Sequence, residues 1–397
     1  MSSIVIAGDT SGSVTLQAPA VAGTTTITLP ATSGTLLQSG TTVTEAQGGT
    51  GTTVGYNGFK NRIINGGITI SQRGVSPTQT GGGDYSVDRF FNYYSGNAYT
   101  SVQSTTAPAG FINSLLLTIT TASASPTYSF FGHKIEGLNC ADLGYGTATA
   151  SAVTLSFWVR SSVAGIYSLS LSNNDGNRAY AASYTINTAN TWEQKSVTIP
   201  GDTSGTWLTT NATGIFIRWN MGTGQAGRLI SAGSWQAANA DGATGSTGAN
   251  TWANTSGATF YITGVQLEKG STATSFDVRP YGTELSLCQR YYYRAVNGNT
   301  QPITNGFYYS STDIRGIINF PCTMRISPSL VSSSGTDHFR LQAVGSDDTF
   351  DTLLDAGPKS TTSMYLYINS NVSGTAGNAG AILSNNASAS LAFNSEL

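Results

Sequence analysis

The sequence contains little charge of either sign. Only 10% of its 397 residues are Asp, Glu, Lys or Arg, against about a quarter in average globular proteins. The 18 basic and 20 acidic residues leave a net charge of −2 and form no basic stripe. Because nucleic-acid binding needs clustered Lys or Arg against phosphates, we expect no nucleic-acid partner.

Cysteine is also scarce, and long apolar runs are missing. Cys140, Cys288 and Cys322 are too few and too widely spaced for a zinc site or a disulfide framework. No stretch approaches the ~20 apolar residues of a membrane helix. The first residues lack the basic and apolar regions of a signal peptide. We therefore predict a chain that folds in a cytoplasm and inserts into no membrane.

What the sequence does contain is typical of β-sheets joined by tight turns: abundant Gly, Thr and Ser with Val and Tyr. The clearest strands are 153–162, 165–172, 178–186, 192–200, 214–221 and 258–268. Turn sequences such as NNDGN at 173–177 separate them, which predicts an all-β jelly-roll sandwich over residues 59–283. Leu155, Phe157 and Val159 alternate along one strand and should face its core.

Two further domains flank this module. Residues 1–58 contain short alternating runs whose apolar face is too small for one chain to bury, which predicts an intertwined β shaft for attachment. A flexible linker is the alternative. Residues 284–397 predict a C-terminal β-sandwich-like domain, acting as a tip or in trimerisation. Between the domains, residues 283–290 predict a short helix capped by Thr283.

The run AQGGTGTT at 46–53 raises the question of a phosphate site. A Walker loop requires a lysine after its glycines and a strand–loop–helix setting. This run has neither, since the nearest lysine is Lys60. We interpret it as a junction, where glycines let the shaft chains turn into the module.

Catalytic chemistry has few candidates. Two facing carboxylates would be needed for acid–base cleavage of a glycosidic bond, and the acids near the module are scattered. They are Asp84, Asp88, Glu136, Asp142, Glu193, Glu268, Asp277 and Glu284. Asp88 beside Arg89 indicates an ion pair or a turn anchor. No G-x-S-x-G motif frames a serine, so we predict no enzyme activity.

Sugar binding fits the composition better. Sugar rings stack on Trp and Tyr, and their hydroxyls need polar partners. The chain has six Trp and 19 Tyr. Trp235 and Trp252 are the favoured sugar-binding candidates, because both lie in a long loop and binding residues are often found on loops. Trp219 has the same strand parity as Ile215 and Ile217, which favours packing in the core. The full candidate set is Trp207, Trp219, Trp235, Trp252, Arg178, Tyr180, Arg218 and Asn220.

Several segments resemble a module common in bacteriophage tail fibres, itself similar to jelly-roll carbohydrate-binding modules. They are FKNRIINGGITISQRG (59–74), LSFWVRSS (155–162), NTWEQKSVTIPGD (190–202) and the run from ATFYITGVQLE to QRYY (258–292). The resemblance extends over residues 45–397. It implies an elongated homotrimeric fibre in the virion that adheres to a host surface polysaccharide. It also implies that the N-terminus joins other tail or baseplate proteins.

Two alternatives stay open beside adhesion: a glycan-degrading tailspike and a purely structural virion spacer. The resemblance also allows a structural calcium beside the opening and closing strands, 64–70 and 262–268. Calcium sites usually include carboxylates, but Gly67, Thr69, Thr263 and Gly264 stand where acids would be expected. We therefore predict no cofactor and no bound metal.

Overall fold

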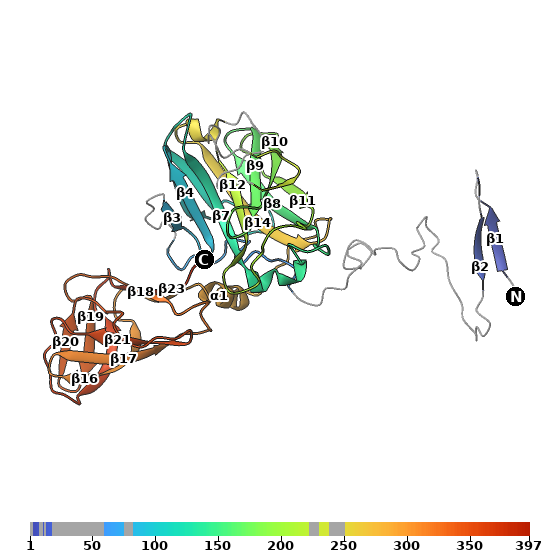
Figure 1. Cartoon of the computed structure of the whole chain (residues 1–397). Coiled ribbons are helices and arrows are strands. Elements are labelled where there is room, and N and C mark those ends of the chain that lie inside the picture. The colour runs from blue at the N-terminus through green and yellow to red at the C-terminus, as the bar shows by residue number, and fades with distance from the viewer. Residues whose placement is uncertain are drawn as a thin grey trace. The chain divides into compact units, whose positions relative to one another are not determined.

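The computed structural model describes residues 3–7, 11, 13–17, 59–74, 82–221, 230–237 and 251–397. It divides into two compact units, 1–55 and 56–397 (Figure 1). In the first unit, β1 (Ser3–Ala7) and β2 (Ser13–Gln17) form an antiparallel pair. The predicted junction at 46–53 and most of the predicted shaft lie outside the described residues.

The second unit begins with a sandwich of two antiparallel sheets, here called the jelly-roll sandwich. The seven-stranded sheet runs, in order, β13 (Trp235–Gln236), β10 (Ala179–Ile186), β9 (Gly165–Ser172), β12 (Thr213–Asn220), β7 (Tyr128–Glu136), β4 (Phe90–Ser95) and β3 (Gly82–Tyr85). The five-stranded sheet runs β11 (Glu193–Ile199), β8 (Val153–Ser161), β14 (Thr259–Lys269), β6 (Ser114–Thr121) and β5 (Ala98–Ser104). Short 3₁₀ turns occupy Gly137–Asn139, Ala141–Leu143 and Trp252–Asn254.

The core of this sandwich lies between the two sheets. Leu155, Phe157 and Val159 are fully buried there, as the alternation along the strand predicted. From the opposite sheet, Trp219 stacks on Phe131 with ring centroids 5.1 Å apart. All six strands predicted in the module are present, and the all-β class is confirmed.

A second pair of antiparallel sheets forms the C-terminal sandwich. Its three-stranded sheet runs β15 (Tyr292–Asn297), β23 (Ser390–Asn394) and β18 (Ser329–Ser332). Its six-stranded sheet runs β20 (Ser346–Phe350), β19 (Phe339–Ala343), β22 (Ala379–Ser384), β16 (Pro302–Ser310), β17 (Asp313–Asn319) and β21 (Ser363–Ile368). Phe339, Leu341 and Phe393 lie in its separate hydrophobic core. The domain limits at residues 58 and 283 remain predictions.

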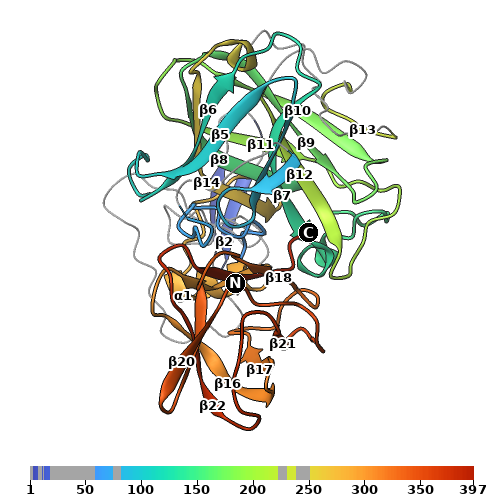
Figure 2. The same ribbon diagram turned by 90° about the vertical axis from the view of Figure 1, so that its left-hand side faces the viewer.

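The helix α1 (Tyr281–Gln289) lies between the two sandwiches in both views (Figures 1 and 2). The predicted helix is confirmed, but the predicted cap is wrong. The N-cap position is Pro280, and Thr283 lies within the first turn. Proline fits there because its fixed φ suits the entry to a helix and it has no N–H to satisfy. Among the described residues, no helix is long and apolar enough to cross a membrane.

Candidate functional site

The outer face of the seven-stranded sheet carries aromatic side chains on four neighbouring strands. Side chains alternate between the two faces of a strand, so the neighbours of the inward-facing Phe131 and Trp219 point outward. The outward aromatic residues are Tyr85 on β3, Phe91 and Tyr93 on β4, Tyr128 and Phe130 on β7, and Phe216 on β12. With Gly82, Gly83, Lys134 and Leu397 they line a cavity of about 380 Å³, here called the aromatic groove.

The rings of the groove are held in place by one another. Tyr93 stacks on Phe130 with centroids 5.4 Å apart and meets the edge of Tyr128 at 5.0 Å. Phe91 lies 5.3 Å from Phe216. Phe91 and Phe130 are each only 4% exposed, whereas the three tyrosines and Phe216 are half-buried. The groove therefore has a packed floor and accessible tyrosine rings.

Gly132 lets the two phenylalanine rings approach across β7. Strand pairing places it opposite Phe91 on one side and Arg218 on the other. A Cβ atom at this position would lie 3.0 Å from Phe91 and 3.1 Å from Phe216, and 2.6 Å from the carbonyl oxygen of Ile217. No side chain fits there without moving the backbone or the rings. The shape of the groove depends on this glycine.

Lys134 supplies the charge of the groove. Its Nζ atom lies 5.4 Å from the ring centroids of both Phe91 and Phe216. It donates a hydrogen bond of 2.7 Å to an oxygen of the terminal carboxylate of Leu397, and the Tyr85 hydroxyl donates to the same oxygen at 3.0 Å. Burial, helped by the nearby Arg218 and Arg89 cations, lowers the pKa of Lys134 to about 8.

This arrangement suits a ligand with both apolar faces and polar edges. Aromatic rings offer apolar contact with a preferred geometry, while the Tyr93 and Tyr128 hydroxyls and the Lys134 ammonium offer hydrogen-bonding groups. The cavity volume lies within the range of small-molecule and cofactor sites, about 300–1,000 Å³. Among the described residues that line it, Lys134 is the one charged side chain and no carboxylate side chain is present.

Four of the predicted candidates come together elsewhere, at one end of the jelly-roll sandwich. Trp207 and Trp235 lie 5.4 Å apart, and Tyr180 lies 5.4 Å from Trp235. Tyr145, which the sequence did not single out, touches Trp207 at 4.8 Å. Arg178 lies beside them, with two hydrogen bonds to Asp202 of 2.8 and 2.6 Å.

Trp207 and Trp235 have structural contacts that stabilise the fold. The Trp235 indole donates to the Pro200 carbonyl at 2.7 Å, and the Trp207 indole donates to Ser204 at 3.2 Å. Both rings also pack against the main core. Their polar atoms are thus already satisfied, and the cluster closes loops around one end of the sandwich.

The remaining candidates are buried. Trp219 is fully buried, which confirms the core interpretation. Trp252 is also fully buried, because its 3₁₀ turn folds onto the sandwich and the ring meets Tyr99 at 5.7 Å. A ring without exposed surface cannot stack on a sugar, so the burial of Trp252 argues against its predicted role in sugar binding. Arg218 and Asn220 point to the outer face, 2% and 1% exposed.

Arg218 nonetheless borders the aromatic groove. Its guanidinium lies 3.4 Å from the centroid of Phe216 and donates to the Ser172 hydroxyl at 2.8 Å. The groove residues themselves were missed by sequence reasoning. The signal was present in the paired aromatics of FFNYY (90–94) and YSFF (128–131). Adjacent residues of a strand face opposite ways, so one aromatic of each pair must lie on the outer face.

The predicted acids are engaged in structural contacts. Asp88 accepts hydrogen bonds from the Gln72 backbone at 2.7 Å and its side chain at 2.5 Å. Of the two roles predicted for Asp88, the ion pair with Arg89 is wrong, because Arg89 instead pairs with Glu396; the hydrogen bonds from Gln72 to Asp88, which lies in a turn, agree with the second role, a turn anchor. Within the described ranges, no group of three or more His, Cys, Asp or Glu side chains gathers to hold a metal ion.

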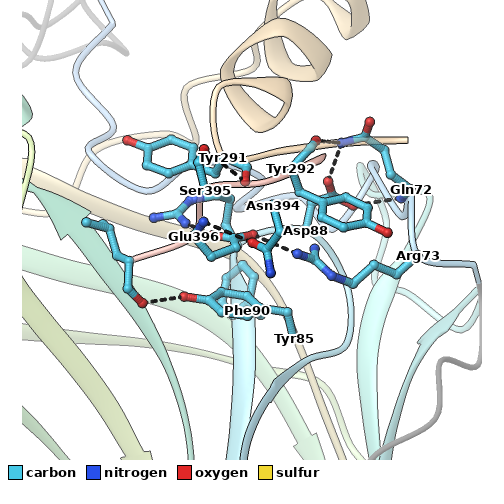
Figure 3. Close-up of polar contacts among 12 residues, drawn as sticks. Gln72, Arg73, Tyr85, Asp88, Phe90, Tyr291, Tyr292, Asn394, Ser395 and Glu396 are labelled. Atoms are coloured by element: carbon cyan, nitrogen blue, oxygen red, sulfur yellow. Dashed lines mark hydrogen bonds and ion pairs between the residues drawn. The ribbon is translucent and has the colours of Figure 1, made fainter. Parts of the chain in front are cut away.

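The end of the C-terminal sandwich reaches the groove through this network (Figure 3). Glu396 pairs with Arg89 and, at 3.2 Å, with Arg73. The Arg73 guanidinium lies 3.7 Å from the ring centroid of Tyr292, and that of Arg89 lies 3.6 Å from Tyr291. These contacts fix residues 394–397 beside β3 and β7, where Leu397 joins the lining of the groove.

No protein-family model matches this sequence, and none of the curated proteins does. Part of the chain is similar in fold to solved structures. The enzymatically active domain of tailspike protein 4 of bacteriophage CBA120 is 14% identical with a TM-score of 0.30, over 53% of this chain and 22% of that one. A family 61 carbohydrate-binding module bound to β-1,4-galactotriose is 12% identical with a TM-score of 0.26, over 53% and 99%.

The first xylan-binding domain of a family 22 pair from Paenibacillus barcinonensis is also similar. It is 9% identical with a TM-score of 0.25, over 48% of this chain and 91% of that domain. The chain spans about a fifth of the tailspike domain that it matches. At these identities the similarity concerns the fold alone.

Proposed function

We propose that this chain is a bacteriophage tail fibre protein that binds a host surface glycan without cleaving it. The observation that carries the proposal is the aromatic groove, which the structure builds from four strands. Its half-buried tyrosines offer flat apolar surface beside hydroxyl groups, the combination that sugar recognition requires. The phage setting rests on the resemblance of the sequence segments quoted above.

The lining of the groove supports the proposal of binding without bond cleavage. Hydrolysis of a glycosidic bond uses two carboxylates on opposite sides of the bond. The described lining offers tyrosines, phenylalanines and a lysine, and no carboxylate side chain. Adhesion is therefore the activity that these residues support, and a glycan-degrading tailspike is the alternative.

A glycan array with the full chain tests the proposal. Tyr93→Ala and Tyr128→Ala should each reduce binding at least tenfold, because each removes a half-buried ring from the groove. Tyr309→Ala is the matched control, since Tyr309 is an exposed tyrosine of the C-terminal sandwich. Equal loss in all three variants, or no binding to any glycan, would count against the groove. Release of oligosaccharides from a bound polysaccharide would establish the tailspike alternative.

The assembly is part of the same proposal. Three linked copies multiply weak binding at each site, because the second and third contacts become intramolecular. We propose that residues 1–58 join the copies and attach the fibre to tail or baseplate proteins in the virion. If chains with and without residues 1–58 show the same mass in solution and the same melting temperature, this role for the segment fails.

A further inference from the structure

We propose that the jelly-roll sandwich has a second glycan site on the outer face of its five-stranded sheet. This site and the aromatic groove hold separate segments of the same surface polysaccharide. The inference rests on the proposed function, because it adds a second site for the same class of ligand. It starts from Trp158 and Trp192, whose rings are half-buried on this sheet.

Trp158 and Trp192 each keep a free indole N–H. Within the described ranges neither indole has a hydrogen-bond acceptor, and neither nitrogen is buried. The other four tryptophans are fully buried or donate their indole N–H to a carbonyl oxygen, as described above. A half-buried aromatic ring with an unused donor offers a ligand both apolar contact and a hydrogen bond.

Strand pairing brings further ligand-binding groups to the same face. Trp158 and Arg160 alternate with the core residues of β8, so they point outward. Gln194 on β11 lies opposite Trp158, and Tyr261 on β14 lies opposite Arg160. The Trp192 and Tyr261 ring centroids are 6.0 Å apart, and the Arg160 guanidinium lies 5.1 Å from the Tyr261 centroid. These five residues, from three neighbouring strands and the start of one, are here called the outer platform.

A cleft of about 390 Å³ begins at Gln194, beside the platform. It is lined by Gln194, Lys195, Ser196 and residues 273–275. The loop at 273–275 follows β14 and is held against it. The Glu268 carboxylate accepts hydrogen bonds from the Thr274 backbone N–H at 2.9 Å and from the Thr274 hydroxyl at 2.7 Å. The cleft is therefore formed by a sheet edge and a fixed loop.

The chemistry of the cleft fits the hydroxyl groups of a sugar. Gln194 and Ser196 are exposed, and their side chains have no hydrogen-bond partner among the described residues. An amide and a hydroxyl can both donate and accept. Lys195 is already paired with Glu193 at 2.6 Å, so the cleft presents mainly uncharged groups. Aromatic faces beside uncharged donors and acceptors match a sugar chain, whose rings have apolar faces and hydroxylated edges.

The outer platform and the aromatic groove lie on opposite sides of the sandwich. The groove is on the outer face of the seven-stranded sheet, and the core separates the two sheets. Packed sheets are about 10 Å apart, and the outer side chains add to this separation. One short oligosaccharide cannot touch both sites, so each site takes its own segment. Two linked sites bind a polymer more tightly than either site alone, because the second contact is intramolecular.

Calorimetric titration of the full chain tests the second site. The probes are tetrasaccharides and polymers of β-1,4-galactan, xylan, mannan and dextran, together with the strongest binder on the glycan array. We expect two tetrasaccharides per chain for at least one probe. The double variant Trp158→Ala/Trp192→Ala should bind one, at the groove, and should lose at least tenfold in affinity for the polymer. The double variant Tyr93→Ala/Tyr128→Ala should also bind one, at the platform.

Controls separate ligand contact from folding. Trp158→Phe and Trp192→Phe keep an aromatic ring and should retain two bound tetrasaccharides. Tyr281→Ala, which removes an exposed tyrosine of α1, should change nothing. If Trp158→Ala/Trp192→Ala fails to fold by circular dichroism, the Tyr93→Ala/Tyr128→Ala protein still decides, since one remaining tetrasaccharide supports the platform and none overturns it. A single tetrasaccharide on the unaltered chain, or two on folded Trp158→Ala/Trp192→Ala, would overturn the inference while leaving the groove intact. Binding of no probe would instead overturn the proposed function.

Discussion

Arg89, in the turn before β4, forms a buried ion pair with Glu396, which lies 307 residues further along the chain. The two side chains are 1% and 5% exposed. The ring of Tyr291 covers the Arg89 guanidinium, and Arg73 is a second cation on the same carboxylate. Desolvated charges, and not apolar contact alone, therefore join the jelly-roll sandwich to the C-terminal sandwich.

Glu396→Gln should destabilise the second unit strongly. Removing one partner of a buried pair leaves an uncompensated charge, which costs about 3–5 kcal/mol. Urea unfolding at pH 7 measures the change. Asp355→Asn is the control, because Asp355 and Lys359 form a more exposed pair and such pairs contribute about 1 kcal/mol or less. If both variants lose a similar amount of unfolding free energy, burial adds nothing to the stabilisation by the Arg89–Glu396 pair.

Trp252→Ala and Trp235→Ala should behave differently. Trp252 is fully buried in the core, and truncation of such a ring costs about 3–5 kcal/mol. Trp235 is half-buried in the loop cluster, so its loss should cost less. Trp235→Ala should also leave glycan binding unchanged, because the ring lies outside the aromatic groove. Loss of binding in a folded Trp235→Ala protein would move the site to the loop cluster.

Gly132→Ala should distort the groove. The added Cβ would lie 2.6 Å from the Ile217 carbonyl oxygen and 3.0 Å from the Phe91 ring, and overpacking of this kind costs about 1–3 kcal/mol. Gly282→Ala is a matched control in α1, where a Cβ meets nothing within 4 Å and alanine favours the helix by about 1 kcal/mol. Thermal unfolding and glycan titration of both variants check this. An unaltered melting temperature for Gly132→Ala would contradict the close packing of the rings.

Lys134 should make stability depend on pH above neutrality. Its pKa is about 8 in the folded chain, below its ordinary value of 10.5. Between these values the unfolded chain binds a proton that the folded chain has released, so the free energy of unfolding rises with pH. The difference in this free energy between the unaltered chain and Lys134→Met should therefore increase from pH 7 to pH 10. A flat difference would mean that the lysine titrates normally.

Much of the fold could be predicted because period-two alternation is a local property of the sequence. Leu155, Phe157 and Val159 fall on the inner face as their spacing requires. The site was harder to predict, because its rings come from strands that are adjacent in space but distant in sequence. Phe91 and Phe216 are 125 positions apart in the numbering, and nothing local shows that their rings lie 5.3 Å apart.

The burial of individual loop residues could not be predicted from the sequence either. Trp235 and Trp252 occur in the same glycine-rich stretch, yet one is half-buried and the other is fully buried. The difference depends on the 3₁₀ turn at Trp252–Asn254, which folds its ring against Tyr99. The predicted ion pair between Asp88 and Arg89 was wrong for a similar reason, because the acid that binds Arg89 lies at the far end of the chain.

The separation of Arg89 and Glu396 also constrains the order of events during synthesis. A ribosome adds roughly 5–20 residues each second and domains tend to fold from the N-terminus onward. Most of the jelly-roll strands emerge well before residue 396, so Arg89 remains without its carboxylate until the last stage of translation. Until Glu396 has been made, the jelly-roll sandwich therefore carries the charged Arg89 side chain on a face that the end of the chain has not yet covered. A chain that ends before Glu396 would therefore leave Arg89 without this carboxylate, even when every strand of the jelly-roll sandwich is present.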